Sequence, residues 1–114
     1  MGPTYEDLEN YEDCRPVFFE SLQQLMLTAG TIHDLEIRTP FITTTKQQII
    51  HIGRLLRVPY EHTWTCYKGE DKPCMICDAC CERIEAFKVN DTRDPLISPD
   101  QWSAYINNVE NVNN

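Results

Sequence analysis

The sequence predicts an α/β fold that carries a small four-cysteine zinc knuckle, and three observations support this prediction. First, a helix, a short strand and a second helix follow one another along residues 16–57, an order typical of layered α/β folds. Second, four cysteines stand at the spacing C-x7-C-x2-C-x2-C within a polar stretch. Third, one strand cannot form a sheet by itself, so we expect its partner strands to lie outside this chain.

The first predicted helix follows an acidic segment, residues 1–15, which has no clear periodicity and is interpreted as a loop. Pro16 suits the first position of a helix, because that position needs no backbone donor. Apolar residues then recur at helical spacing as far as Ala29, and Gly30 offers a left-handed stop. Residues 16–29 are therefore predicted to be helical.

The predicted strand and the second helix come next in the chain. Segment 34–38 alternates between apolar and polar residues, which is typical of a short strand. Thr45 and Gln48 form a capping-box pattern that starts a helix running to about residue 57. Gly53 inside this helix costs roughly 1 kcal/mol relative to alanine, so we expect another segment of backbone to pack closely there.

Two further helices are predicted in the C-terminal half of the chain. Residues 78–89 form the first, with Asp78 as its cap and with Ile84 and Phe87 facing inward. Ser98, followed by a proline, starts the second as a short amphipathic helix. The apolar face of this last helix consists of Trp102, Tyr105, Ile106 and Val109.

The cysteine spacing points to a metal site. A C-x2-C step lets two thiolates face one ion, and four soft thiolates in tetrahedral reach suit zinc. No fifth ligand is evident in the sequence, so the site is interpreted as closed and structural, fastening a loop that lacks apolar residues. The expected ligands are Cys66, Cys74, Cys77 and Cys80.

Three alternatives to zinc stay open on the residues alone. Disulfides are one, because the six cysteines are an even number, although no segment has signal-peptide character. An iron–sulfur cluster is another, although the expected Cys-Pro completion is missing. Unmetallated core thiols are the third. Cys14 has no catalytic base paired with it in sequence, and Cys81 is interpreted as a bystander beside a ligand.

The composition excludes some classes of partner. The chain has 114 residues, enough for one small domain, and its formal net charge is −8. This charge argues against direct nucleic-acid binding, which normally needs a basic face, and against an anionic membrane surface. No apolar run approaches membrane-spanning length, so the cytoplasm is the expected location.

Several motifs fall together in one register along residues 2–96. They are W-T-C-Y-K-G at 64–69, K-P-C at 72–74, C-D-A-C at 77–80, Arg83, Y-E-D-C-R-P at 11–16, K-Q-Q-I-I at 46–50 and D-P-L at 94–96. In combination they resemble the 7-cyano-7-deazaguanine synthases, the QueC family of queuosine and deazapurine biosynthesis.

This resemblance implies a fold and a reaction. The fold is that of a P-P-loop ATPase (HUP-like, adenine nucleotide alpha hydrolase-like), of which this chain would be the C-terminal part. The reaction is the conversion of 7-carboxy-7-deazaguanine and ammonia to the nitrile, with ATP and Mg²⁺, in the cytoplasm. The family enzymes bind one structural zinc through the four knuckle cysteines, and they are often homodimers.

The resemblance also implies positions for substrate contacts. Asp13 and Arg15 would sit near the deazaguanine or its activated intermediate, and Lys46 would face the nucleotide or carboxylate region. Each has a simpler interpretation: Asp13 could cap a helix, Arg15 could be a surface ion-pair partner, and Lys46 could be a solvated charge. No catalytic residue is assigned.

The chain departs from the family pattern in ways that bear on function. Gly2, Gly30, Gly53 and Gly69 are scattered, so the glycine-rich loop that cradles phosphate is missing. Met75 replaces a glycine of the knuckle, and Glu12 replaces a proline. We therefore expect an N-terminal half to be supplied in trans. The alternative is a zinc-stabilised interaction module or an inactive remnant of the family.

The sequence divides into three expected segments. Residues 1–60 would be the C-terminal part of the α/β nucleotide-binding-type domain. Residues 61–97 would be the zinc knuckle and the helix after it. Residues 98–114 would be the C-terminal helix and a frayed tail.

Overall fold

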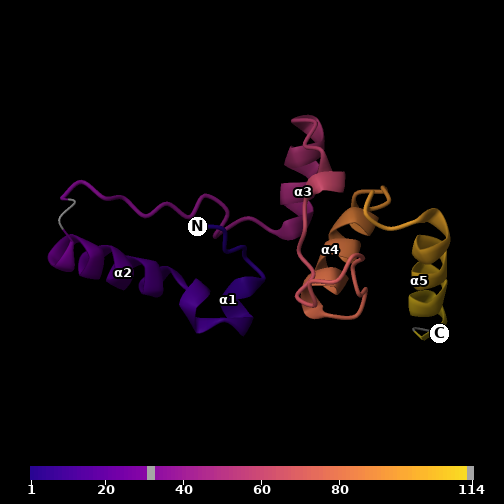
Figure 1. Ribbon diagram of the computed structural model, residues 1–114, viewed down its shortest axis with the longest axis horizontal. Coiled ribbons are helices and arrows are strands. Elements are labelled where there is room, and N and C mark those ends of the chain that lie inside the picture. The colour runs from indigo at the N-terminus through magenta and orange to yellow at the C-terminus, as the bar shows by residue number, and fades with distance from the viewer. Residues whose placement is uncertain (31–32, 113–114) are drawn as a thin grey trace. The chain divides into compact units, whose positions relative to one another are not determined.

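The computed structural model describes residues 1–30 and 33–112, and every regular element among them is helical (Figure 1). Among these residues, no helix has both the length and the apolar character needed to cross a bilayer. The elements are α1 (Asp7–Asn10), η1 (Glu12–Cys14), α2 (Pro16–Ala29), α3 (Lys46–Leu55), η2 (Tyr60–His62), α4 (Asp78–Val89) and α5 (Pro99–Val112).

The chain forms two compact units, Met1–Ile49 and Ile50–Asn114, and the division falls inside α3. The first unit carries α1, η1 and α2, and the second carries η2, α4 and α5. The three segments that the sequence predicts, residues 1–60, 61–97 and 98–114, stay a prediction.

The acidic segment at the N-terminus contains more structure than the predicted loop. Asp7 accepts hydrogen bonds from the backbone N–H of Thr4 at 2.7 Å and from its hydroxyl at 2.9 Å. This pairing supports the start of α1, and the turn η1 follows it directly. The loop prediction was wrong for residues 7–10 and 12–14, which form α1 and η1. Glu6 is the N-cap of α1 and makes no side-chain cap hydrogen bond, so the pairing of Thr4 with Asp7 closes the turn before the helix.

Helix α2 has the bounds that the sequence predicts, but it does not end in the predicted left-handed conformation. Pro16 stands in its first turn, and the N–H of Gly30 donates to the carbonyl of Met26 at 2.9 Å, which completes the last turn. Gly30 has φ −87° and ψ 160°, which is extended backbone, so a left-handed stop at this residue was the wrong prediction. Phe19 is the buried residue of this helix.

The predicted strand over residues 34–38 is absent, and the α/β prediction is not confirmed within the described residues. The segment still has a strand's alternation, with Leu35 and Ile37 partly buried and their neighbours exposed. The side chain of Gln23 in α2 donates to the carbonyl of Leu35 at 2.5 Å and accepts from the N–H of Ile37 at 2.6 Å. A side-chain amide thus takes the place of a neighbouring strand, and no ladder forms.

Helix α3 starts with the predicted capping box. The N–H of Gln48 donates to the hydroxyl of Thr45 at 3.2 Å, and the side chain of Gln48 accepts from the N–H of Thr45 at 3.0 Å. The helix ends at Leu55, slightly before the predicted residue 57, and Arg57 turns the chain with φ 56°.

The second unit is built around a small core of Ile50, Ala86 and Phe87, with Tyr60 and Trp102 packed against it. The rings of Tyr60 and Phe87 meet edge to face, with centroids 5.2 Å apart. A Cβ added at Gly53 would clash with the Tyr60 hydroxyl, so a neighbour does pack closely on this glycine. The neighbour is the side chain of Tyr60, and the prediction of a second segment of backbone was wrong.

Helices α4 and α5 run where the sequence predicts them. Cys77 is the N-cap of α4, so the prediction that Asp78 caps this helix was wrong; Asp78 is its first helical residue. In α5 the N–H of Gln101 donates to the hydroxyl of Ser98 at 3.3 Å, as a capping box requires.

Candidate metal centre

The four predicted cysteine ligands come together in the second unit. Cys66 and Cys74 lie in the loop after η2, Cys77 caps α4, and Cys80 lies in the first turn of that helix. Their Sγ atoms all lie within 4.8 Å of one another, and those of Cys74 and Cys80 are 4.0 Å apart. The structure therefore confirms that the C-x7-C-x2-C-x2-C spacing gathers four thiols around one point.

The local backbone explains how a polar loop reaches this arrangement. Gly69 has φ 63°, and Met75 has φ 61° within the C-x2-C turn, where the left-handed conformation is unfavourable for a residue with a side chain. That turn brings the N–H of Cys77 to 3.4 Å from the Sγ of Cys74. The N–H of Cys74 lies 3.4 Å from the Sγ of Cys66 in the same way.

Backbone donors favour the thiolate form of two of these cysteines. A backbone hydrogen bond from Ile76 is the main cause that lowers the pKa of Cys74, to about 6. A backbone hydrogen bond from Tyr67 likewise lowers the pKa of Cys77. Burial raises the pKa of Cys80 to about 12, so this thiol needs a nearby positive charge to ionise. A bound cation would supply that charge.

The donor set fits zinc. A tetrahedral ion with zinc–sulfur bonds of about 2.3 Å places its sulfurs about 3.8 Å apart, close to the 4.0 Å between Cys74 and Cys80. Four soft thiolates also match zinc better than they match magnesium or calcium, which prefer oxygen ligands. The four cysteines can thus hold a metal ion with a modest contraction of the site.

A buried ion pair supports the loop that carries Cys66. The guanidinium of Arg83 in α4 contacts the carboxylate of Asp94, with Nε 2.5 Å from Oδ2 and Nη2 2.9 Å from Oδ1. It also donates to the hydroxyl of Thr63 at 2.9 Å and to the carbonyl of Tyr60 at 3.1 Å. Arg83 therefore connects α4 to η2, to the segment after α4, and to the start of the knuckle loop, which is the loop between η2 and α4. The sequence motifs contain both charged residues but did not predict their pairing.

The predicted substrate residues lie in the first unit, apart from the cysteines in sequence. Asp13 is exposed in η1, and Arg15 is exposed at the N-cap of α2, where its Nε donates to the carbonyl of Leu8 at 3.2 Å. Lys46 is partly buried at the start of α3, with Nζ 3.7 Å from Oδ1 of Asp7. The shared role of Asp13, Arg15 and Lys46 as substrate contacts stays a prediction.

Asp7 matches an aspartate of the family pattern, but the sequence assigned it no role. Its carboxylate binds Thr4 and also pairs with Lys46, which fixes the position of the lysine. Cys14 lies nearby, and burial, with smaller contributions from Asp13 and Asp7, raises the pKa of its thiol. A raised pKa opposes the thiolate form, consistent with leaving Cys14 out of the nucleophile candidates.

Comparison with known proteins gives a consistent result. The family model described as "Queuosine biosynthesis protein QueC" matches residues 1–91. A protein from Archaeoglobus fulgidus is 44% identical over 96 residues, which cover 84% of this chain and 40% of that protein. One from Halobacterium salinarum is 46% identical over 98 residues, and one from Chloroherpeton thalassium is 42% identical over 98. These cover 84% of this chain and 42% and 43% of the respective relatives.

All three relatives carry the name 7-cyano-7-deazaguanine synthase. The chain spans less than half the length of these relatives. No solved structure matches it.

Proposed function

Because the chain belongs to the QueC family, we propose that it supplies the zinc knuckle and part of the substrate wall of a 7-cyano-7-deazaguanine synthase. The complete enzyme would convert 7-carboxy-7-deazaguanine and ammonia to 7-cyano-7-deazaguanine, with ATP and Mg²⁺. The observation that carries this proposal is the gathering of four Sγ atoms within 4.8 Å, inside the region matched by the family.

In this proposal the metal is one structural zinc. The knuckle loop between η2 and α4 exposes Tyr67 and Ile76, so apolar burial does little to hold it. Zinc bound to four thiolates would close the loop onto α4 and stabilise its fold, because the ligands are brought together only when the loop is folded.

Substrate contacts are proposed for Asp13, Arg15 and Lys46. The ion pair between Lys46 and Asp7 supports this role for the lysine, because it holds the ammonium group in a partly buried position. The Arg15 side chain is 46% exposed, and such a planar donor suits a carboxylate or a phosphate group. The two positions would face the activated carboxylate of the deazaguanine.

We further propose that the nucleotide site lies outside these residues. The scattered glycines provide no phosphate-cradling loop, and the chain spans 40% to 43% of the relatives compared above. Gln23 holds one edge of segment 34–38 in an extended conformation. The opposite edge, at Glu36, is where a strand of the N-terminal half would add to form the parallel sheet of the family fold, whereas the carbonyl of Arg38 on that edge accepts from the amino group of Met1.

Native mass spectrometry of the chain purified from its own source tests the proposal. We expect one zinc per chain and a complex with a larger polypeptide. Cys74→Ser should abolish zinc retention, whereas Cys14→Ser, a cysteine outside the cluster, should leave it unchanged. Equal zinc content in the two variants would overturn the metal site. Nitrile synthesis by the purified chain alone would overturn the need for a partner.

One observation favours a second candidate, a zinc-held interaction module without chemistry of its own. The second unit has its own core around Phe87 and its own buried ion pair between Arg83 and Asp94, as expected of a self-contained folding unit. A zinc-bearing monomer that unfolds cooperatively and captures no N-terminal half would support this candidate. Restoration of nitrile synthesis by an added N-terminal half would exclude it.

A further inference from the structure

Helix α2 carries an apolar stripe of the kind that a folded domain buries. Five apolar residues recur along the helix at spacings of three and four, which places them within about 100° of its circumference. Glu20, the one charged residue of the helix, lies on the opposite side. The five residues, which we call the α2 stripe, are Phe18, Leu22, Leu25, Met26 and Ala29.

The α2 stripe is largely exposed in the structure. Leu25 is 61% exposed, Met26 is 41% exposed and Phe18 is 38% exposed. Of the five residues, Leu22 alone is partly buried. A single exposed apolar residue needs no explanation, but a continuous stripe of them marks a contact surface.

Packing within the first unit covers only the neighbouring side of α2. Phe19 is the buried residue of the helix, and the side chain of Gln23 bonds to the backbone of segment 34–38. Even on this side an open groove of about 260 Å³ remains between α2 and the segment that carries Ile37 and Ile42. The described part of the first unit therefore contains too little chain to enclose α2.

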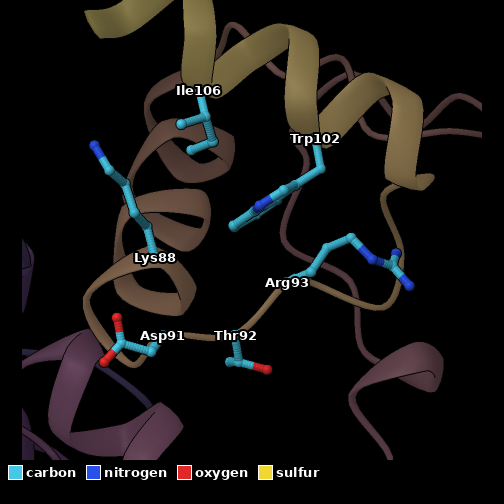
Figure 2. A pocket seen from close by; sticks show the side chains of 6 residues that line it. All are labelled: Lys88, Asp91, Thr92, Arg93, Trp102 and Ile106. Carbon is cyan, nitrogen blue, oxygen red and sulfur yellow. The ribbon is translucent and has the colours of Figure 1, made fainter.

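In the second unit, by contrast, the chain supplies a cover for helix α4. Trp102 of α5 packs on the core around Phe87. Figure 2 shows Trp102 and Ile106 projecting from α5 into a shallow groove of about 230 Å³, which Lys88 of α4 borders. The side chain of Val109 lies outside the described ones, so its predicted place on this face of α5 is not tested.

The chemistry of the α2 stripe selects the kind of partner that fits it. None of its five side chains is charged or donates a hydrogen bond, so it suits a dry apolar surface. A second copy of the chain is disfavoured, because two chains of net charge −8 repel each other. A helix about 10 Å wide covers roughly two strands spaced about 4.8 Å apart, and α2 has one extended segment beside it. A further strand therefore fits against the stripe.

The length of the relatives indicates where that strand comes from. The chain spans 40% to 43% of the relatives compared above, and the proposed function assigns the remainder to an N-terminal half with a parallel sheet. Parallel sheets are apolar on both faces and are covered by helices on each. Such a sheet needs covering helices, and α2 is an amphipathic helix that needs a sheet.

We propose that the α2 stripe is a docking surface for the N-terminal half of the synthase, and that its occupant is an apolar face of the parallel sheet in that half. This inference rests on the proposed function, which requires the half. It adds a second contact to the edge at Glu36, and it explains why a predicted core stripe is exposed in this chain.

The test is the affinity of the full 114-residue chain for a defined partner. The partner is the part of the Archaeoglobus fulgidus relative that this chain does not match, co-expressed as a separate polypeptide. Sedimentation of the purified complex over a dilution series gives the Kd. Leu25→Glu should raise the Kd at least about tenfold, because it places a carboxylate in an apolar contact.

Val17→Glu is the matched control. Val17 lies in the same helix and is 63% exposed, close to the 61% of Leu25, but it stands outside the α2 stripe. The two variants add the same charge, so the Kd of Val17→Glu should stay within about twofold of wild type. An equal rise of the Kd in both variants, or no rise in either, would overturn the docking surface and leave the proposed function standing.

The isolated variants show whether the stripe is free before the half binds. Because Leu25 is exposed in the chain alone, Leu25→Glu should leave the urea midpoint of unfolding and the zinc content of the isolated chain unchanged. A lower midpoint would mean that this chain already buries the stripe. A dimer of the wild-type chain that Leu25→Glu dissociates would mean that a second copy covers it. Either result would overturn the inference.

The outcomes also separate this inference from the zinc site. A wild-type chain that binds no N-terminal half would overturn the docking surface, and its zinc content would still test the knuckle. A wild-type chain that binds the half but holds no zinc would overturn the knuckle and leave the docking surface standing.

Discussion

Replacing Asp94 by asparagine should destabilise the second unit more than any other change of similar size. The Asp94 side chain is 1% exposed, and its carboxylate contacts both Nε and Nη2 of Arg83, which is 8% exposed. Asparagine keeps the shape but loses the charge, and its amide group places a donor against a guanidinium that is itself only a donor. The buried cation of Arg83 is then left uncompensated.

The expected loss follows from the cost of breaking a buried ion pair by removing one partner, about 3 to 5 kcal/mol. Small domains have a total stability of about 5 to 15 kcal/mol, so this loss removes a large part of it. Urea unfolding of Asp94→Asn and wild type measures the difference, at one fixed concentration of free zinc because a bound metal adds its own stabilisation.

Glu85→Gln is the matched control. Its carboxylate lies 3.9 Å from Nζ of Lys88 on the exposed side of the same helix, so its loss should cost less than about 0.5 kcal/mol. Replacing both Arg83 and Asp94 by apolar residues should cost less than the sum of the single changes, because no charge is left buried. A loss below about 1 kcal/mol in Asp94→Asn would refute the view that this pair organises the unit.

Three further predictions concern a packing contact, a cap and the metal site. Gly53→Ala should destabilise the unit by about 1 to 3 kcal/mol in urea unfolding despite its better helix propensity, because the new Cβ would lie 1.9 Å from the Tyr60 hydroxyl; a more stable variant would contradict this. Thr45→Ala should lower the free energy of unfolding by about 1 kcal/mol in the same assay, because the cap of α3 is lost. An unchanged urea midpoint of unfolding would count against the capping box. Folding lowers the pKa of Cys74 from 9.0 to about 6, so the thiolate form of Cys74 stabilises the folded state. This stabilisation is fully present above about pH 9 and is lost as the pH falls through about 6. Zinc retention, measured by chelator competition, should therefore fall steeply below about pH 6, and retention that is independent of pH down to 5 would argue against thiolate ligands.

The sequence predicted the features that depend on neighbours along the chain. The spacing of Cys74, Cys77 and Cys80 brings their Sγ atoms together, because a C-x2-C turn and the first turn of a helix have defined dimensions. The capping boxes at Thr45 and Ser98 are equally local, and both were found. The local pairing of Thr4 with Asp7 was not predicted.

Features that depend on distant partners were not predicted, or were predicted wrongly. The alternation in segment 34–38 was recognised, but a strand also needs a second strand, and here the side chain of Gln23 occupies one edge. The partnership of Arg83 with Asp94 and Thr63 joins residues 11 and 20 positions apart, and no periodicity reports it. The φ of Met75 was not predicted either, although its place in a knuckle glycine position was a signal of left-handed backbone.

With the proposed zinc bound, two cross-links of different chemistry would act on the same polar loop, and together they would explain why a core as small as that around Phe87 suffices. Arg83 fixes the start of the loop through Tyr60 and Thr63, and zinc would fix the remainder through the cysteines. Since the ion pair involves none of the cysteines, it can hold the start of the loop before the metal arrives. Zinc would then meet a site that is already partly assembled, so the entropy of closing the loop weakens the metal affinity less than it would in a fully unfolded knuckle.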